Sequence, residues 1–114
     1  MTDASAGIPF DEIDAETAIA SLSDYRVVDV RGLDEFEGPL GHLGGSELLS
    51  TEQLCEAAPA LGERPLLLVC RSGRRSGLAC QQLIALGVSS VTNLKGGMIA
   101  WNEAELPFEG KSAG

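Results

Sequence analysis

Segments with a strand pattern alternate along this chain with segments that have the spacing of helices. The runs at 26–30 and 65–69 are rich in Val and Leu and predict buried strands, because a strand covered on both faces is apolar along its length. The segment 88–94 predicts another strand, and shorter patterns predict strands at 8–12 and 46–49. We expect the 65–69 strand to lie in the centre of the sheet.

Helix signals lie between these strands. Asp14 has the side chain of a helix N-cap, for a helix that ends near Leu22. Ser50 and Gln53 have the spacing of a capping box, in which two side chains satisfy the free amides at a helix start. This box predicts a helix from there to about Ala58.

A longer helix is expected from Ser76 onward, where the period of apolar residues changes. The apolar residues that recur at helical spacing are Ala79, Leu83 and Leu86, and Gly87 follows as the expected residue past the helix end. Gly96-Gly97 then turns the chain into a short helix that contains Trp101, a core residue by its type. Strands separated by helices predict an α/β domain with a mainly parallel central sheet flanked by helices.

Composition limits the domain count and the class of partner. The 114 residues fit one domain, 1–114, with a core at about 8–106 and a loose tail at 107–114. The net charge of −9 argues against nucleic acids and anionic membranes as partners. No apolar stretch near the cysteines approaches the length of a membrane helix, and the N-terminus lacks the pattern of a signal peptide.

The cysteines and the histidine exclude two kinds of site. The three cysteines, Cys55, Cys70 and Cys80, form no CxxC motif, and His42 is the only histidine. A disulfide scaffold and a zinc site are therefore not expected, and neither is any other metal or organic cofactor. Reduced cysteines fit a cytoplasmic location. We expect Cys80 to lie in the core and Cys55 to be inert or at the surface.

The segment from Cys70 to Ser76 carries the candidate chemistry. It begins directly after the 65–69 strand, and in open α/β sheets ligands bind beyond the carboxyl ends of the strands. Gly73 permits the positive φ that a nest of inward-pointing amides needs. The amides, a helix N-terminus and nearby arginines would favour a thiolate at Cys70 and the docking of an anion. These arginines are Arg71, Arg74 and Arg75.

Four segments in order resemble the single-domain rhodaneses, which are thiosulfate sulfurtransferase-like proteins. They are Val27 to Arg31, Asp34 to Leu43 with its Gly-His-Leu, Cys70 to Ser76, and Leu94 to Trp101 with its Gly-Gly pair. The resemblance implies a rhodanese-like fold and a two-step reaction. In it Cys70 takes sulfur from a small anionic donor such as thiosulfate, becomes a persulfide, and passes the sulfur to cyanide or a thiol.

The resemblance also implies roles for the residues around Cys70. The loop residues Arg71, Ser72, Gly73, Arg74, Arg75 and Ser76 would bind the substrate and the persulfide. Arg71 would favour thiosulfate, Arg74 would point to solvent and steer anions, and Arg75 would turn inward and brace the loop. Four residues would give structural support, with Glu35 as the partner of Arg31: Asp29, Arg31, Glu35 and His42. Gly44-Gly45 stands where the family usually has Pro-Gly, which leaves that loop more flexible.

Two other functions stay open at this stage. Cell-cycle phosphatases share the fold and a cysteine loop, but their loop is one residue longer than the segment between Cys70 and Arg75, so phosphatase or arsenate reductase activity is less expected. The second alternative is a persulfide carrier that a sulfur-relay protein loads at Cys70. The acidic net charge fits a basic protein partner.

Overall fold

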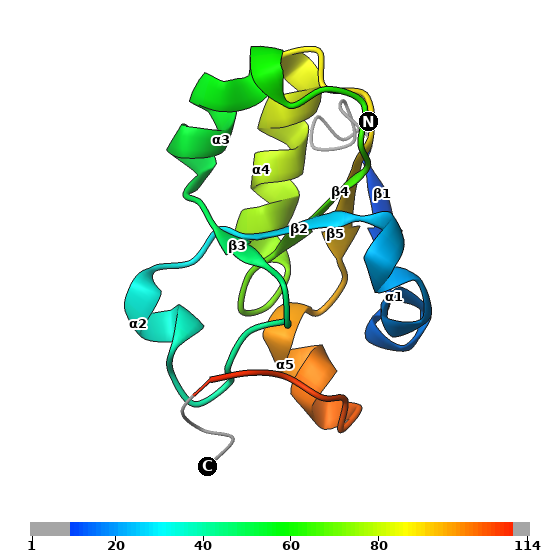
Figure 1. The fold of residues 1–114 in the computed structure, drawn as a ribbon, viewed down its shortest axis with the longest axis vertical. Helices are drawn as coiled ribbons and strands as arrows, with labels where there is room; N and C mark the ends of the chain where they lie inside the picture. The colour runs from blue at the N-terminus through cyan, green and yellow to red at the C-terminus, as the bar shows by residue number, and fades with distance from the viewer. Residues whose placement is uncertain (1–9, 111–114) are drawn as a thin grey trace, which may run out of the picture.

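Five parallel strands and five α-helices alternate along the chain in the computed structural model, which describes residues 10–110 (Figure 1). The strands are β1 (Asp11–Ile13), β2 (Arg26–Asp29), β3 (Glu47–Leu48), β4 (Leu66–Val69) and β5 (Val91–Leu94). The helices are α1 (Ala15–Ser21), α2 (Leu33–Phe36), α3 (Thr51–Ala57), α4 (Arg74–Ala85) and α5 (Gly97–Glu103). Short 3-10 turns follow α1 at Leu22–Asp24 and α3 at Ala58–Ala60.

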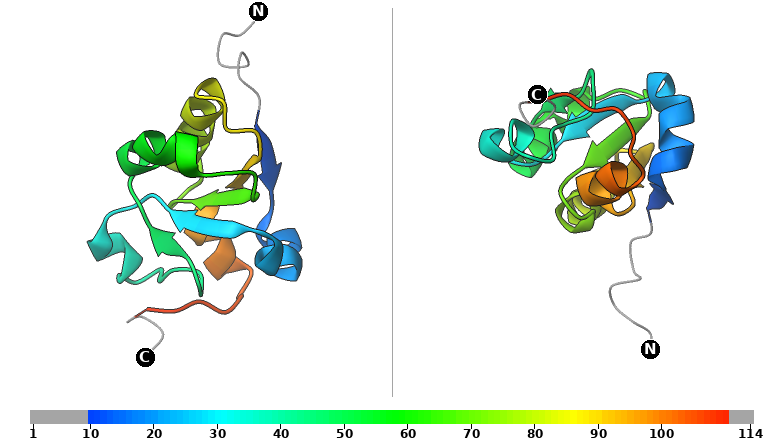
Figure 2. Two further views of the ribbon diagram at one scale, coloured as in Figure 1. Left: turned by 45° about the horizontal axis from the view of Figure 1, so that its top comes forward. Right: turned by 90° about the horizontal axis from the view of Figure 1, so that it is seen from below.

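The sheet has the strand order β1-β5-β4-β2-β3, and every neighbouring pair is parallel. The expected parallel α/β sheet with β4 at its centre is therefore confirmed. Because β1 and β3 are the edge strands, the helices that follow β1 and β2 lie far apart. All views place α1 and α2 at opposite sides of the molecule (Figures 1 and 2).

Successive side chains of the central strands enter two separate cores. Leu66 and Leu68 of β4 pack with Leu54 of α3 and Leu83 of α4 on one face. Leu67 and Val69 pack on the other face with residues of α1 and α5, among them Ala18, Met98 and Trp101. Since β4 is buried on both faces, its sequence has no polar alternation. The two cores fix the end of β4, and with it the position of Cys70.

The expected helix caps are present. The Thr17 amide donates to Asp14 Oδ1 over 2.8 Å, and α1 begins at the next residue after Asp14. The Ser50 hydroxyl accepts from the Gln53 amide while the Gln53 side chain accepts from the Ser50 amide, so the capping box is complete. Of the first expected strand, residues 8 and 9 lie outside the described residues, and β1 covers Asp11–Ile13.

The long helix begins earlier than expected, and it ends where expected, with Gly87 just past its C-cap. It begins at Arg74 rather than Ser76, because the turn at Gly73 is already complete there. Leu86 is 56% exposed rather than part of the core. The helix ends at Ala85, and the positive φ of Gly87 (96°) turns the chain so that Val88 takes the next buried position.

The segment expected to be loose is partly held in place. The His42 amide donates to the Glu109 carbonyl and the Glu109 amide to the His42 carbonyl, both over 2.8 Å. The Trp101 indole donates to the Pro107 carbonyl. Residues 107–110 thus differ from the expected loose tail because they pair with the loop around His42, and 111–114 lie outside the described residues. Between residues 10 and 110 no helix has the length and hydropathy needed to cross a membrane.

Candidate active site

Cys70 directly follows β4, at the carboxyl end of the sheet's central strand. The chain turns at Gly73, whose φ of 92° lies in the left-handed region, and α4 begins at the next residue. A Cβ on Gly73 would lie 3.0 Å from the Gly96 nitrogen and 3.2 Å from the Leu94 oxygen. Glycine is therefore needed here both for its backbone angle and for the close approach of a second segment.

Hydrogen-bond donors surround the Cys70 sulfur. The Gly73 amide donates to Sγ over 3.1 Å and the Ser76 amide over 3.4 Å, and the Ser76 hydroxyl oxygen lies 3.3 Å from Sγ. Burial raises the pKa of the Cys70 thiol, but the Ser76 side chain and the amides of Ser76, Gly73 and Ser72 outweigh it. The net effect is a pKa below the ordinary cysteine value, as expected for a nest of amides.

Access to this sulfur differs from the sequence-based expectation. Cys70 is 0% exposed, so an anion cannot dock against it in this conformation. The amides that were expected to hold a bound sulfur atom instead contact Sγ itself. A second sulfur atom on Cys70 therefore requires the loop to widen around it.

The first turn of α5 bonds to the backbone of the Cys70 loop. The Met98 amide donates to the Cys70 carbonyl over 2.9 Å, and the Ile99 amide to the Arg71 carbonyl over 3.0 Å. These bonds keep the two carbonyl oxygens occupied away from the sulfur. Gly97 makes the approach possible, since a Cβ there would lie 2.4 Å from the Cys70 oxygen. In the sequence, Gly96-Gly97 predicted a turn and formed part of the family resemblance, although two adjacent glycines also indicate a close backbone approach.

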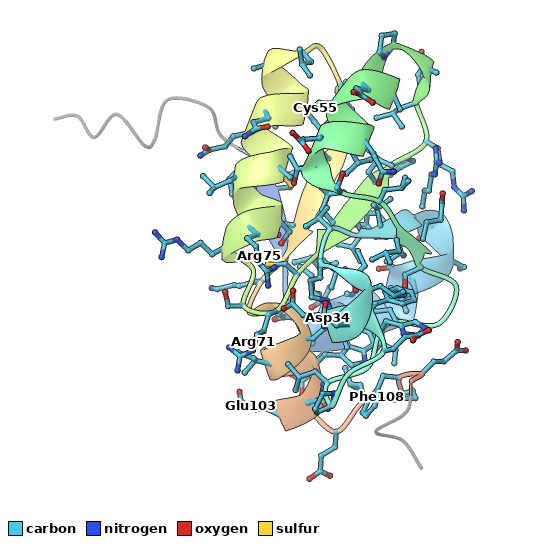
Figure 3. The ribbon with its side chains drawn as sticks, turned by 90° about the vertical axis from the view of Figure 1, so that its left-hand side faces the viewer. Asp34, Cys55, Arg71, Arg75, Glu103 and Phe108 are labelled. Carbon is cyan, nitrogen blue, oxygen red and sulfur yellow. The ribbon has the colours of Figure 1, made fainter. Side chains whose placement is uncertain are left out.

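The three arginines of the loop have different surroundings. Arg71 and Arg74 are exposed, as expected for Arg74. Arg75 does not turn inward: its guanidinium donates two bonds to the Glu35 carboxylate, over 2.9 and 2.8 Å. Figure 3 shows Arg75 at the start of α4 beside α2, and Arg71 beside the start of α5. Arg75 thus ties α4 to α2, and this ion pair holds the pKa of Glu35 below its ordinary value.

Arg31 pairs with Asp29 and not with Glu35, which corrects the expectation. Its Nε lies 2.8 Å from Asp29 Oδ1 and its Nη2 lies 2.6 Å from Asp29 Oδ2. The same Nη2 donates to the Gly41 carbonyl over 2.7 Å. Both side chains are buried, so Arg31 folds back on the nearest carboxylate, whereas Glu35 on α2 faces α4. The pair holds the loop around Gly41, in agreement with a structural role.

His42 also braces this loop. Its Nδ1 lies 2.7 Å from the Phe36 carbonyl oxygen, and its ring stacks on the Phe36 ring with centroids 3.7 Å apart. A cavity of about 260 Å³ is lined by Arg31, Glu35, Pro39, Leu40 and Arg71. This cavity opens next to the Cys70 loop, on the side of Arg71.

Asn93 is the residue at this site that sequence reasoning missed. It lies on β5, is 1% exposed, and accepts a bond from the Ser76 hydroxyl at Oδ1. Its Nδ2 donates to the Gly73 carbonyl over 3.0 Å and to Glu12 Oε2 over 2.9 Å. The available signal was an amide side chain inside a segment read as a buried strand, because a buried polar side chain requires partners.

The other two cysteines have separate surroundings. Cys80 is buried on α4, and burial together with Glu12 and Cys70 raises the pKa of its thiol to about 12. Cys55 is half-buried on α3, with its sulfur 3.6 Å from Gln82 Oε1. Among residues 10–110, no three His, Cys, Asp or Glu side chains are grouped as metal ligands would be.

Known proteins are similar to this chain in sequence and in fold. The Rhodanese-like domain family model matches residues 14–104. The chain is 38% identical over 87 residues to the thiosulfate sulfurtransferase GlpE of Shewanella oneidensis, covering 75% of this chain and 84% of GlpE. It is 37% identical over 90 residues to an uncharacterized Synechocystis protein, covering 71% of this chain and 45% of that protein.

A solved structure from Rhodopseudomonas palustris, described as a protein of unknown function and possible tyrosine phosphatase, superposes with a TM-score of 0.80. It is 27% identical, and the match covers 93% of this chain and 89% of that one. The chain spans only 45%, 64% and 53% of the length of three curated relatives that it matches. A family match that runs from the cap of α1 to the end of α5, on a shared fold, shows that this chain belongs to the Rhodanese-like domain family.

Proposed function

We propose that this domain transfers sulfane sulfur through a persulfide on Cys70, with thiosulfate or a similar small anion as the donor. The observation that carries the proposal is the ring of donors from Gly73 and Ser76 around a Cys70 sulfur whose pKa is lowered. Similarity to the thiosulfate sulfurtransferase GlpE supports the same class of reaction.

The proposed reaction has two displacement steps at sulfur. The Cys70 thiolate attacks the outer sulfur of thiosulfate, a new S–S bond forms, and sulfite leaves with the electron pair of the broken S–S bond. The product is a Cys70 persulfide anion. Cyanide or a thiolate then attacks the terminal sulfur, and Cys70 leaves as the thiolate from which it started. No oxidant or metal is needed, because the sulfur moves between two nucleophiles.

The chain supplies charge stabilisation for both steps. The amides that contact Sγ are positioned to donate to the terminal sulfur once the loop widens, where the negative charge of the persulfide lies. Arg71 and Arg74 are exposed beside the loop and would attract a doubly charged donor. Arg75 contributes less to binding, since Glu35 occupies its guanidinium.

The burial of Cys70 favours one variation on this proposal. Because Cys70 is 0% exposed, the loop must open before sulfur arrives, and contact with a sulfur-relay protein would provide that opening. Persulfide formation by a cysteine desulfurase at a higher rate than by thiosulfate would identify the carrier function. Phosphatase activity is disfavoured, since only four residues separate Cys70 from Arg75, one fewer than in the phosphatase loop, and Glu35 occupies the Arg75 guanidinium.

Mass spectrometry of the protein after incubation with thiosulfate tests the proposal. We expect a gain of one sulfur atom that maps to Cys70, and turnover of thiosulfate with cyanide. Cys70→Ser should abolish both, while Cys55→Ser, at a half-buried thiol away from the loop, should retain both. Sulfur gain and turnover that persist in Cys70→Ser would refute the proposal, and hydrolysis of a phosphate ester dependent on Cys70 would support a phosphatase instead.

A further inference from the structure

The orientation of the Asn93 side chain is determined by its neighbours. Its Nδ2 lies 2.9 Å from Glu12 Oε2 and 3.0 Å from the Gly73 carbonyl oxygen. The Gly73 carbonyl oxygen can only accept a hydrogen bond, so the atom facing it must be the amide nitrogen. Asn93 Oδ1 therefore faces Ser76, where it too can only accept. The parallel pairing of β1 with β5 sets this arrangement, since Glu12 and Asn93 are partners in the register.

Ser76 has one hydroxyl hydrogen and two neighbours that could take it. Its Oγ lies 2.5 Å from Asn93 Oδ1 and 3.3 Å from Cys70 Sγ. Because Oδ1 has no hydrogen to offer, the short bond requires Ser76 to donate to Asn93. The Ser76 oxygen then faces Cys70 with a lone pair, and the contact between them needs a thiol that donates S–H. When Cys70 is a thiolate, the Ser76 hydroxyl must rotate to donate to Sγ and leave Asn93.

We propose that Asn93 is a positioning residue that holds the Ser76 hydroxyl hydrogen away from Cys70 until the thiol loses its proton. The thiol proton goes to solvent and the Ser76 hydroxyl only rotates, so no proton passes between the two residues. This inference deepens the proposed sulfur transfer and rests on it, since the role of Asn93 is to set the pH at which the Cys70 sulfur becomes a nucleophile. Glu12 and Gly73 orient the Asn93 amide so that its Oδ1 can accept the hydroxyl hydrogen of Ser76.

Other charged and titratable groups near Cys70 must be kept constant in the test. They come from α4, from the end of β2, from the loop and from β1: Arg75, Cys80, Asp29, Arg71 and Glu12. The variants replace none of these residues. Asn93→Leu and Asn93→Asp do remove the bond to Glu12, but they remove it equally with and without the Ser76 hydroxyl, so the comparison with Ser76→Ala cancels that change. Cys80 does not ionise in the same range, because its pKa is about 12.

The test is a titration of the ultraviolet absorbance of the Cys70 thiolate, in a Cys55→Ser background and without a sulfur donor. The absorbance of a Cys55→Ser/Cys70→Ser protein is subtracted, which removes the contributions of Tyr25 and Cys80 to the signal. Asn93→Leu keeps the approximate volume of the side chain and removes the acceptor. We expect this variant to lower the midpoint of the Cys70 titration by about half to one pH unit, which corresponds to the free energy of one neutral hydrogen bond.

A double-mutant comparison separates the effect through Ser76 from a general loosening of the loop. In Ser76→Ala protein the hydroxyl is absent, so Asn93→Leu should no longer lower the midpoint. Asn102→Leu is the control, because the Asn102 amide nitrogen likewise donates two hydrogen bonds, to the backbone carbonyls of Leu40 and Met98, and its loss should leave the midpoint unchanged. Asn93→Asp keeps an acceptor and strengthens it, so it should raise the midpoint, and more so when Ser76 is present.

Equal shifts from Asn93→Leu with and without the Ser76 hydroxyl, or a shift to higher pH that needs the hydroxyl, would overturn the inference. Unfolding curves of each variant show whether it is folded, and Asn93→Asp supplies the opposite-sign test if Asn93→Leu is not. Because no sulfur donor is present, the titration result does not depend on whether the protein catalyses sulfur transfer. A failed sulfur-transfer assay would refute the proposed function and leave the Asn93 result intact.

Discussion

Replacing Gly97 with alanine tests whether α5 shapes the Cys70 loop. Gly97 has a φ of 58°, and a Cβ there would lie 2.4 Å from the Cys70 oxygen and 2.5 Å from the Arg71 oxygen. Both are backbone atoms, so neither can swing aside as the end of a side chain would. The start of α5 must move away, which lengthens the bonds from the Met98 and Ile99 amides to these same carbonyls.

The expected cost follows from these contacts. A left-handed backbone angle costs alanine about 1–2 kcal/mol. Two weakened hydrogen bonds cost about 0.5–1.5 kcal/mol each, so Gly97→Ala should lower the free energy of unfolding by about 2–5 kcal/mol. Gly62→Ala is the matched control, because Gly62 has a φ of 72° and nothing within 4 Å of its Cβ position. It should show the backbone cost alone.

Urea unfolding of the three proteins measures the difference. We also expect a higher pKa of Cys70 in Gly97→Ala, because freed carbonyls allow the loop amides to turn away from the sulfur. If Gly97→Ala destabilises the protein no more than Gly62→Ala does, then α5 does not hold the loop, and our account of how the amides are oriented is wrong.

Three further predictions concern side chains around the site. Asp29→Asn leaves the buried Arg31 charge without its carboxylate and should lower the free energy of unfolding by about 3–5 kcal/mol in urea; little change would contradict a structural role. A double-mutant cycle on Arg75 and Glu35 should give a coupling of about 0.2–1 kcal/mol, because the pair is partly exposed. The pKa of Glu35 is lower in the folded protein, so this coupling should be present at neutral pH and vanish as the pH falls through that lowered value; a coupling that persists in acid would contradict the assignment. Cys80 should resist alkylation at neutral pH in the folded protein and react after unfolding, as peptide mass mapping would show; equal reactivity in both states would contradict its burial.

Local patterns in the sequence predicted most of the fold. The run at 65–69 is apolar throughout because both faces of β4 are covered, and the caps at Asp14 and Ser50 act within four residues along the chain. Gly73 marked the turn after Cys70 by its conformational freedom. Gly87 marked the end of α4 correctly, but helical spacing misjudged Leu86, since an apolar residue at the last turn of a helix can lie beyond the edge of the core.

Contacts between distant segments could not be predicted in this way. Glu35 bonds to a residue 40 positions away, Asn93 to Ser76 17 positions away and to Glu12 81 positions away. Which of these groups meet depends on the strand order, because β5 lies between β1 and β4.

The sequence by itself therefore determined the elements, the parallel sheet and the cysteine loop, because these depend on the burial and spacing of neighbouring residues. Only the tertiary structure decided that the amides of Gly73 and Ser76 enclose the Cys70 sulfur, that α5 bonds to the loop carbonyls and that Asn93 bonds to Ser76. The physical reason is that a hydrogen bond needs its two groups within about 3 Å, a distance that sheet order and packing set for residues far apart in the chain.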